Sequence, residues 1–207
     1  DEKVDFVFYP SVEEMYPYGK NLTYVEVTKL QDILCGKYRS GHFRGVATVV
    51  TKLFNIIKPH KAYFGEKDYQ QLKIIQQMVK DLNFDIEIVP VVTIREENGL
   101  ACSSRNSYLS SSEYKVANSL YKSLLYCRDL ILQKKYNIKK CIRKSKEYLS
   151  SLLSKVKHKI QYFEIHDANL NSVNDDISKI PPGTELRIFV AVFIGSTRLI
   201  DNIGFKI

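Results

Sequence analysis

Residues 62–72 read AYFGEKDYQQL and decide the fold. The short apolar run 62–64, closed by Gly65, is typical of a buried strand. From Asp68 onward the apolar residues have helical spacing, and the next apolar run, 86–92, again indicates a strand. A strand, a helix and a strand in this order predict a βαβ unit in a parallel sheet.

The segment before this unit predicts one further helix. From Gly41 onward the apolar residues recur at helical spacing, and Pro59 ends the pattern because proline cannot continue a helix. Two other apolar runs, Val4–Tyr9 and Tyr24–Val27, are predicted to be strands.

The pattern changes after Arg95. A polar stretch leads to Ser110 or Ser111, either of which can cap a helix running to about Gln133, with Glu113 early in it. A second helix is predicted over 138–153. Three strands follow, over 161–166, 185–194 and 197–203. We therefore expect a domain boundary near 94–107, with residues 1–94 in an α/β domain and 95–207 in a smaller α+β domain.

The net charge is +8 and falls on one half of the chain. Residues 1–106 are balanced, and the basic excess lies in 107–207, mostly in 134–159. A basic face can bind nucleic acid or attract an anionic substrate. The simpler interpretation is a solvated face on lysine-rich helices, because a charge run alone is weak evidence.

Composition excludes several classes of protein. No apolar stretch has the roughly 18 to 20 residues that a membrane span requires, and the start resembles no signal peptide. The four cysteines form no CxxC pair, so we expect reduced, mostly buried thiols and no metal site. The chain does not begin with Met, and the strand-like run at its start suggests a chain cut within a domain. We expect a cytoplasmic protein.

Two polar clusters stand at predicted helix starts. In 36–45, glycines allow a tight turn, and Arg39 can grip a carboxylate or phosphate; alternatively Ser40 only caps the helix, and His42 is structural. In 65–71, Lys67 stands where a nucleotide phosphate would bind. Asp68 with Gln71 also has the form of a capping box, which would explain those two side chains without a ligand.

A third cluster, Cys102-Ser103-Ser104-Arg105-Asn106, lies at the expected domain junction. Two hydroxyls and a guanidinium suit a phosphate-binding loop, since phosphate oxygens accept several hydrogen bonds at once. A surface turn would have the same composition.

Taken together and in this order, the clusters resemble the pantoate–β-alanine ligase (pantothenate synthetase) family. The resemblance rests on LCGKYRSGHFRGVATVVTKLF (34–54), AYFGEKDYQQL (62–72) and IREENGLACSSRNSYLS (94–110), with a further likeness in VFYPSVEEMYPYG (7–19). It covers nearly the whole chain and is weakest in the helices 113–158. It implies a Rossmann-like nucleotidyltransferase fold, related to class I aminoacyl-tRNA synthetases, with a small C-terminal lid.

The resemblance also implies a two-step reaction. Pantoate attacks the α-phosphate of ATP to give pantoyl adenylate and pyrophosphate, and β-alanine then displaces AMP to give pantothenate. Mg²⁺ would assist, and the protein would act by positioning the substrates and neutralising phosphate charge. The family implies a homodimer when the chain is full length, no membrane association and no nucleic-acid partner.

Individual roles follow from the same resemblance. Gly65 and Asp68 match ribose contacts, Lys67 matches a phosphate-contacting lysine, and Ile94 lies where a backbone group contacts adenine. The triphosphate loop, similar to the KMSKS loop of the synthetases, is matched by three residues, Ser103, Ser104 and Arg105. Pantoate-side contacts are matched by Gln71, Arg39 and His42. Lys67, Ser103, Ser104 and Arg105 are the expected catalytic residues.

Some positions depart from the family pattern. Ser40 replaces a proline, Cys102 a methionine and Asn98 an aspartate, and none of these removes a charged catalytic group. The family's HIGH-like histidine motif and a second pantoate-binding glutamine are not among the 207 residues. We therefore expect this chain alone to have little or no ligase activity.

Alternative functions stay open at this point. Another adenylate-forming nucleotidyltransferase would share the nucleotide site without Gln71 and the full GHFRGV segment. A basic nucleic-acid-binding module would use 134–159, although no RNA-binding or helix-turn-helix signature supports it. A partial product that keeps the fold without catalysis is a third possibility.

Overall fold

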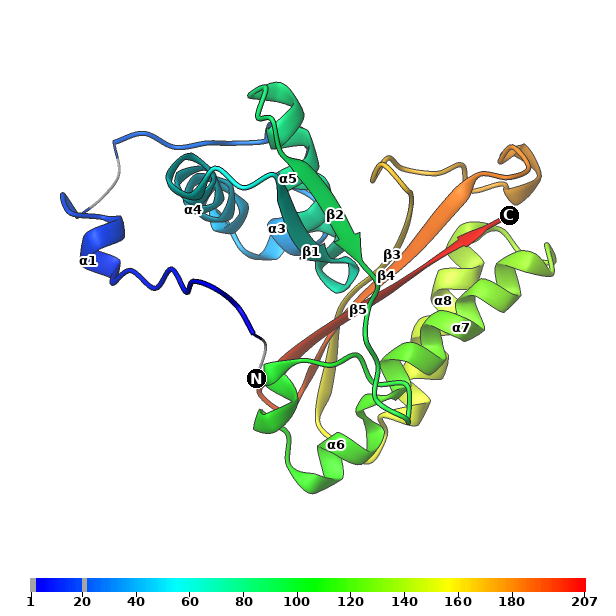
Figure 1. Cartoon of the computed structure of the whole chain (residues 1–207). Coiled ribbons are helices and arrows are strands. Elements are labelled where there is room, and N and C mark those ends of the chain that lie inside the picture. Colours follow the sequence, from blue (N-terminus) through cyan, green and yellow to red (C-terminus); the bar gives the residue numbers. More distant parts are fainter. Residues whose placement is uncertain (1–2, 20–21) are drawn as a thin grey trace.

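The computed structural model describes residues 3–19 and 22–207. A two-stranded parallel sheet with its helices forms one part, and a three-stranded antiparallel sheet backed by two long helices forms the other (Figure 1). The α/β class with a smaller α+β part, predicted from the sequence, is confirmed.

The predicted βαβ unit is present. Strand β1 (Lys61–Gly65) leads through the short 3₁₀ helix η1 (Glu66–Asp68) into helix α5 (Tyr69–Asp81), and β2 (Glu87–Val91) returns parallel to β1. Strand–helix packing through apolar residues such as Ala62, Ile75 and Ile88 joins the unit. This connection brings η1 to the carboxyl end of β1, the usual position of ligand sites in parallel sheets.

Helix α4 (His42–Ile57) packs beside α5. Gly41 precedes it with φ of +73°, a conformation that glycine adopts at no steric cost, and Lys58 ends it in the same left-handed region, just before Pro59. Two shorter helices, α2 (Thr28–Gln31) and α3 (Leu34–Tyr38), complete this part of the molecule.

The two strands predicted before residue 28 are wrong. Residues 4–9 have no strand partner among the described residues, and the Phe6 side chain is 94% exposed. Residues 24–27 are extended, but the Val25 N–H donates to Thr48 Oγ1 (3.0 Å) instead of to a neighbouring strand. An apolar run makes a strand only where a ladder of backbone partners exists. Between these segments lies α1 (Val12–Met15).

The C-terminal part follows the prediction with one correction. Strands β3 (His158–Asp167), β4 (Glu185–Ile194) and β5 (Thr197–Lys206) form an antiparallel sheet. A short 3₁₀ helix, η3 (Ile177–Lys179), lies in the loop before β4. Helix α8 spans Ile138–Leu152.

The single helix expected up to Gln133 is two helices, α6 (Ser111–Ala117) and α7 (Ser119–Leu132). Ser110 caps α6 in a capping box with Glu113, as predicted. The break falls at Asn118, whose side-chain amide donates to the Asn98 carbonyl (3.2 Å), so a tertiary contact fixes the bend.

The antiparallel sheet is covered on both faces. Side chains of one face, such as Phe163 and Val190, pack under α7 and α8. Those of the other face, such as Tyr162 and Phe189, pack against Leu34 and Tyr69 of the N-terminal part. Because successive strand residues point to opposite faces, one sheet serves two cores. The division at residues 94 and 95 stays a prediction.

Candidate functional site

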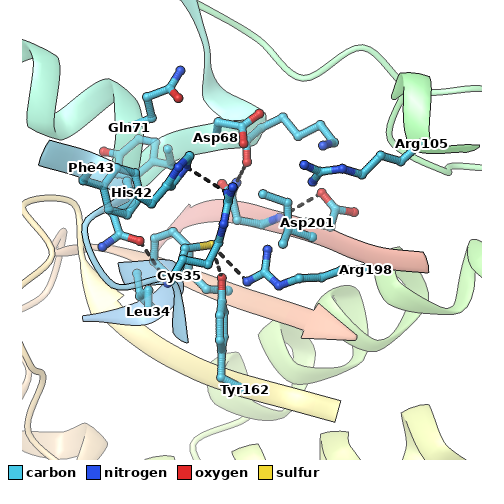
Figure 2. A pocket seen from close by; sticks show the side chains of 17 residues that line it. Leu34, Cys35, His42, Phe43, Asp68, Gln71, Arg105, Tyr162, Arg198 and Asp201 are labelled. Carbon is cyan, nitrogen blue, oxygen red and sulfur yellow. Dashed lines mark hydrogen bonds between the residues drawn. The ribbon is translucent and has the colours of Figure 1, made fainter. Parts of the chain in front are cut away.

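A cavity of about 220 Å³ lies where the end of β1 meets β5. Figure 2 shows its lining, with Asp68, His42 and Phe43 on one side and Arg198, Asp201 and Tyr162 on the other. The elements that line it come from both parts of the molecule: α3, α4, η1 and α5 from the first, and β3, β4, β5 and the 3₁₀ helix η2 (Ser104–Tyr108) from the second.

The 65–71 motif supplies one wall of the cavity. Lys67, Asp68 and Gln71 all line it. Asp68 occupies the N-cap position of α5, but its side chain makes no capping bond, so the capping box considered from the sequence is absent. The carboxylate of Asp68 and the amide of Gln71 are therefore not explained by helix capping.

The 36–45 motif supplies a second wall. Arg39 Nη1 lies 2.9 Å from His42 Nε2, and both residues line the cavity. Gly41, not Ser40, is the N-cap of α4, so the capping role considered for Ser40 is wrong. Since a guanidinium only donates, the contact requires an unprotonated Nε2 on His42.

Burial lowers the pKa of His42 below its ordinary value of 6.5, and the positive charges of Arg39, Arg198 and Arg105 lower that pKa further. The negative charge of Asp68 opposes this shift. His42 is therefore neutral at pH 7 and can accept a hydrogen bond from Arg39.

The 102–106 cluster reaches the cavity through one residue. Arg105, on η2, lines it. Ser103 Oγ accepts from the Arg105 N–H (3.2 Å), so this hydroxyl shapes the turn that presents the guanidinium. Lys67 and Arg105 thus face the same cavity from the two parts of the chain.

Four predicted residues lie outside the lining. Ser104 is next to the lining residue Arg105, and Gly65 and Ser103 each lie two positions from a lining residue, whereas the Ile94 side chain is 63% exposed. The role expected of Ile94 involves its backbone, which side-chain exposure does not test.

Strand β5 contributes residues that sequence reasoning missed. Asn202 Nδ2 donates to the backbone carbonyls of Glu66 and Lys67 (2.9 Å each), and Asn202 Oδ1 accepts from Arg187 Nη1 (2.7 Å). Arg187 also lies over the Tyr69 ring, 3.7 Å from its centroid. This buried network fixes the backbone that carries Lys67.

Asp201 helps to fix Arg105, the second candidate phosphate contact beside Lys67. Its carboxylate pairs with Arg95 through two bonds of 2.7 and 2.9 Å, and Arg95 also donates to the Gly99 carbonyl (3.1 Å). Arg95 stacks on Tyr121 at 3.8 Å. Burial raises the pKa of Asp201, and the hydrogen bonds and charge of Arg95 oppose the rise. The pair anchors the segment that leads to Arg105.

The cavity floor is a third contact between the two parts. Cys35 Sγ lies 3.1 Å from Tyr162 Oη and accepts from Arg198 Nη2 (3.3 Å), while Arg198 Nε donates to Gln161 Oε1 (2.8 Å). Burial, together with the neighbouring Cys35, raises the pKa of Tyr162, so its hydroxyl stays protonated. Gln70 Oε1 accepts a hydrogen bond from the Cys35 backbone N–H (3.0 Å).

A usable signal for the missed residues was present in the sequence. The strand predicted over 197–203 carries Arg198, Asp201 and Asn202 between apolar residues. Charged residues in a buried strand are retained only when paired or when they serve a ligand. We predicted the strand but assigned no role to these three side chains.

The charge balance of the cavity favours an anion. Four cationic side chains line it: Arg39, Lys67, Arg105 and Arg198. The two lining carboxylates are Asp68 and Asp201, and Asp201 is already paired with Arg95. Such an excess of donors and positive charge suits phosphates or carboxylates.

Within residues 3–19 and 22–207 no group of three or more His, Cys, Asp or Glu could hold a metal ion, and no helix is long and apolar enough to cross a membrane. The four cysteines are free, and Cys35, Cys127 and Cys141 are buried, as predicted, whereas Cys102 is exposed.

Comparison with protein families gives a match over almost the whole chain. Residues 1–204 match the family described as Pantoate-beta-alanine ligase. Among curated proteins, the pantothenate synthetase of Caldicellulosiruptor saccharolyticus is 53% identical over 207 residues, which cover 100% of this chain and 70% of that protein. The pantothenate synthetase of Coprothermobacter proteolyticus is 50% identical, covering 99% of this chain and 70% of that protein.

Solved structures agree. The crystal structure of pantothenate synthetase from Thermus thermophilus superposes with a TM-score of 0.86 at 42% identity, over 97% of this chain and 70% of that one. Pantoate-beta-alanine ligase from Francisella tularensis, solved in complex with beta-gamma ATP and beta-alanine, gives a TM-score of 0.66 at 36% identity. The superposition with that structure covers 92% of this chain and 61% of the Francisella chain.

Proposed function

The chain belongs to the pantoate–β-alanine ligase family, and from that premise we propose that its cavity binds ATP, pantoate and β-alanine and joins the two acids through a pantoyl adenylate. The observation that carries the proposal is the convergence of Lys67 and Arg105 on one cavity from opposite parts of the chain. Neither side chain has a carboxylate within 4.0 Å among the described residues.

The first step requires charge neutralisation. An oxygen of the pantoate carboxylate attacks the α-phosphorus of ATP, the bond between the α-phosphorus and the bridging oxygen breaks, and pyrophosphate leaves. Lys67 and Arg105 would stabilise the charge on the phosphates, and Ser103 and Ser104 would bind the triphosphate from the same loop. Gly65, Asp68 and the backbone of Ile94 would hold the nucleoside.

The second step is amide formation. The neutral amine of β-alanine attacks the acyl carbon, the bond from that carbon to the AMP oxygen breaks, and the amine loses a proton. Gln71, Arg39 and His42 would orient the pantoyl group. Because His42 is neutral at pH 7 and bonded to Arg39, it supports a hydrogen-bonding role beside the acyl group.

Mg²⁺ is the metal ion that the family resemblance implies for this site. This ion is commonly held by one or two carboxylates together with substrate phosphates. Asp68 is assigned to the ribose and Asp201 is paired with Arg95, so the ion would be held by substrate phosphates and water rather than by a protein carboxylate. When bound, the ion would supply further neutralisation of phosphate charge.

Binding by the 207-residue chain tests the proposal. Calorimetry with ATP should give saturable binding, and Lys67→Met and Arg105→Met should each weaken it by at least tenfold, since each removes a charged phosphate contact. Lys80→Met is the matched control, because Lys80 is exposed at the far end of α5. ATP binding that survives both site substitutions would contradict the proposal.

We expect weak or absent ligase turnover by these 207 residues alone, because they contain no His-x-x-His segment of the kind that the family places at the α-phosphate. Pantothenate formation, followed by mass spectrometry, checks this. Robust turnover would show that the residues described here suffice. A homodimer of the full-length protein is part of the same proposal.

A further inference from the structure

Arg198 is the cavity cation to which the family resemblance gives no role. It lies on β5, and its guanidinium enters the cavity beside Cys35 and Tyr162, away from Asp68 (Figure 2). Among residues 3–19 and 22–207, no carboxylate lies within 4.0 Å of this guanidinium. A half-buried positive charge without a counter-ion is costly, so it calls for an anionic ligand.

The guanidinium is held in place before any ligand arrives. Its Nε–H donates to Gln161 Oε1 (2.8 Å), and one Nη2–H points to Cys35 Sγ (3.3 Å). A guanidinium has five N–H groups, so those of Nη1 and the second of Nη2 remain free. These free groups lie along the end of the guanidinium fork, and they match the two oxygens of a carboxylate.

The surroundings restrict the ligand further. Four apolar side chains, Leu34, Phe43, Phe189 and Ile200, line the same cavity. Apolar walls next to a guanidinium suit a short aliphatic acid, whose methylene groups would pack there while the carboxylate meets Arg198.

This inference rests on the proposed function, which supplies three substrates. ATP has no carboxylate, and the carboxylate of pantoate is consumed at the α-phosphate. β-Alanine alone keeps a free carboxylate, carried on two methylene groups, through both steps. We propose that Arg198 binds the carboxylate of β-alanine and thereby directs its amine toward the acyl group.

The test compares ligand affinities across variants. β-Alanine is titrated by saturation-transfer NMR, and ATP by calorimetry, into the 207-residue chain and its variants. Arg198→Gln should weaken β-alanine binding at least tenfold and change ATP affinity less than twofold. Arg198→Lys should give an intermediate loss for β-alanine, because a lysine keeps the charge but not the fork. The matched control, Arg128→Gln, lies on the exposed face of α7 and should change neither affinity.

A second ligand separates carboxylate recognition from a purely structural effect. β-Alaninamide keeps the amine and the methylene groups but lacks the carboxylate, so it should bind the unsubstituted chain as weakly as β-alanine binds Arg198→Gln. Melting temperatures of both Arg198 variants within a few degrees of the unsubstituted chain are expected, since the side chain is only half-buried.

Several outcomes would overturn the inference. β-Alanine binding that is unchanged in Arg198→Gln, or not detectable in the unsubstituted chain, would remove the carboxylate role. An equal loss of ATP and β-alanine affinity would make Arg198 a phosphate contact instead. If the unsubstituted chain binds β-alanine through Arg198 but does not bind ATP, the proposed ligase function fails while the carboxylate site stands.

Discussion

The two parts of the molecule contribute side chains to the candidate site in different ways. Residues 3–94, as far as they are described, present their functional side chains on turns at the ends of β1 and α3, where Arg39, Lys67 and Asp68 border the cavity. Residues 95–207 enclose a core of their own and offer polar side chains from within a buried strand. The first part supplies most of the candidate substrate contacts, and the second part adds Arg105 and Arg198 and fixes where Lys67 lies.

The same contrast appears in packing. The core under α7 and α8 contains fully buried side chains such as Leu124 and Leu153. Near the other end of the chain, Leu22 is 99% exposed. Loss of a contact should therefore lower the free energy of unfolding most in the C-terminal part and at the junction, and least in the segment before α2.

The largest expected effect is at the junction. Arg95→Met leaves the carboxylate of Asp201, which is 4% exposed, buried without its partner. Breaking a buried ion pair in this way costs about 3–5 kcal/mol in the free energy of unfolding. Urea denaturation measures it, with Arg128→Met, at an exposed ion pair, as control. Equal small effects of both substitutions would show that the junction is not held by this pair.

A core substitution should come next. Leu124→Ala removes a side chain with no exposed surface, and such truncations cost about 2–5 kcal/mol. Leu22→Ala should change the free energy of unfolding by less than about 0.5 kcal/mol. Urea midpoints of the two variants give the comparison, and similar midpoints would contradict the contrast in packing.

A substitution in β5 tests the positioning role of the C-terminal part. Asn202→Ala removes the donor to the Glu66 and Lys67 carbonyls, so Lys67 loses its fixed place. We expect ATP affinity to fall about tenfold, or about 1.4 kcal/mol. Calorimetry checks this against Asn169→Ala, whose side chain bonds Lys73 at the surface. An unchanged ATP affinity in Asn202→Ala would leave Asn202 as a stability residue only.

The smallest effect concerns His42. Because the pKa of His42 is lowered in the folded chain, the unfolded chain binds more protons below pH 6.5. The stabilisation is therefore present above the unfolded pKa of 6.5 and is lost as the pH falls through the folded pKa. The side chain is partly exposed, so this contribution is modest.

NMR titration of the His42 ring measures that pKa directly. Bound ATP should raise it, because the triphosphate offsets the charges of Arg39, Arg198 and Arg105. A His42 pKa at or above 6.5, or one that ATP does not change, would contradict the electrostatic description of the cavity.

Sequence reasoning predicted the parts that local rules control. The βαβ unit, α4, the cap at Ser110 and the three C-terminal strands follow from apolar period, glycine and capping residues. Six predicted site residues line the cavity: Arg39, His42, Lys67, Asp68, Gln71 and Arg105.

The failures occurred where distant residues decide. Residues 4–9 form an apolar run typical of a strand, but no described strand pairs with them. The break at Asn118 depends on a bond to Asn98, 20 positions away. Asn202 reaches η1 across more than 130 residues. No local pattern encodes such pairings, because they exist only once the sheet has formed.

The most direct test is a crystal structure of the chain with a non-hydrolysable ATP analogue. The account predicts a triphosphate lying between Lys67 and Arg105, within hydrogen-bond distance of both side chains. A triphosphate bound elsewhere, or one that contacts only one of these two side chains, would contradict it.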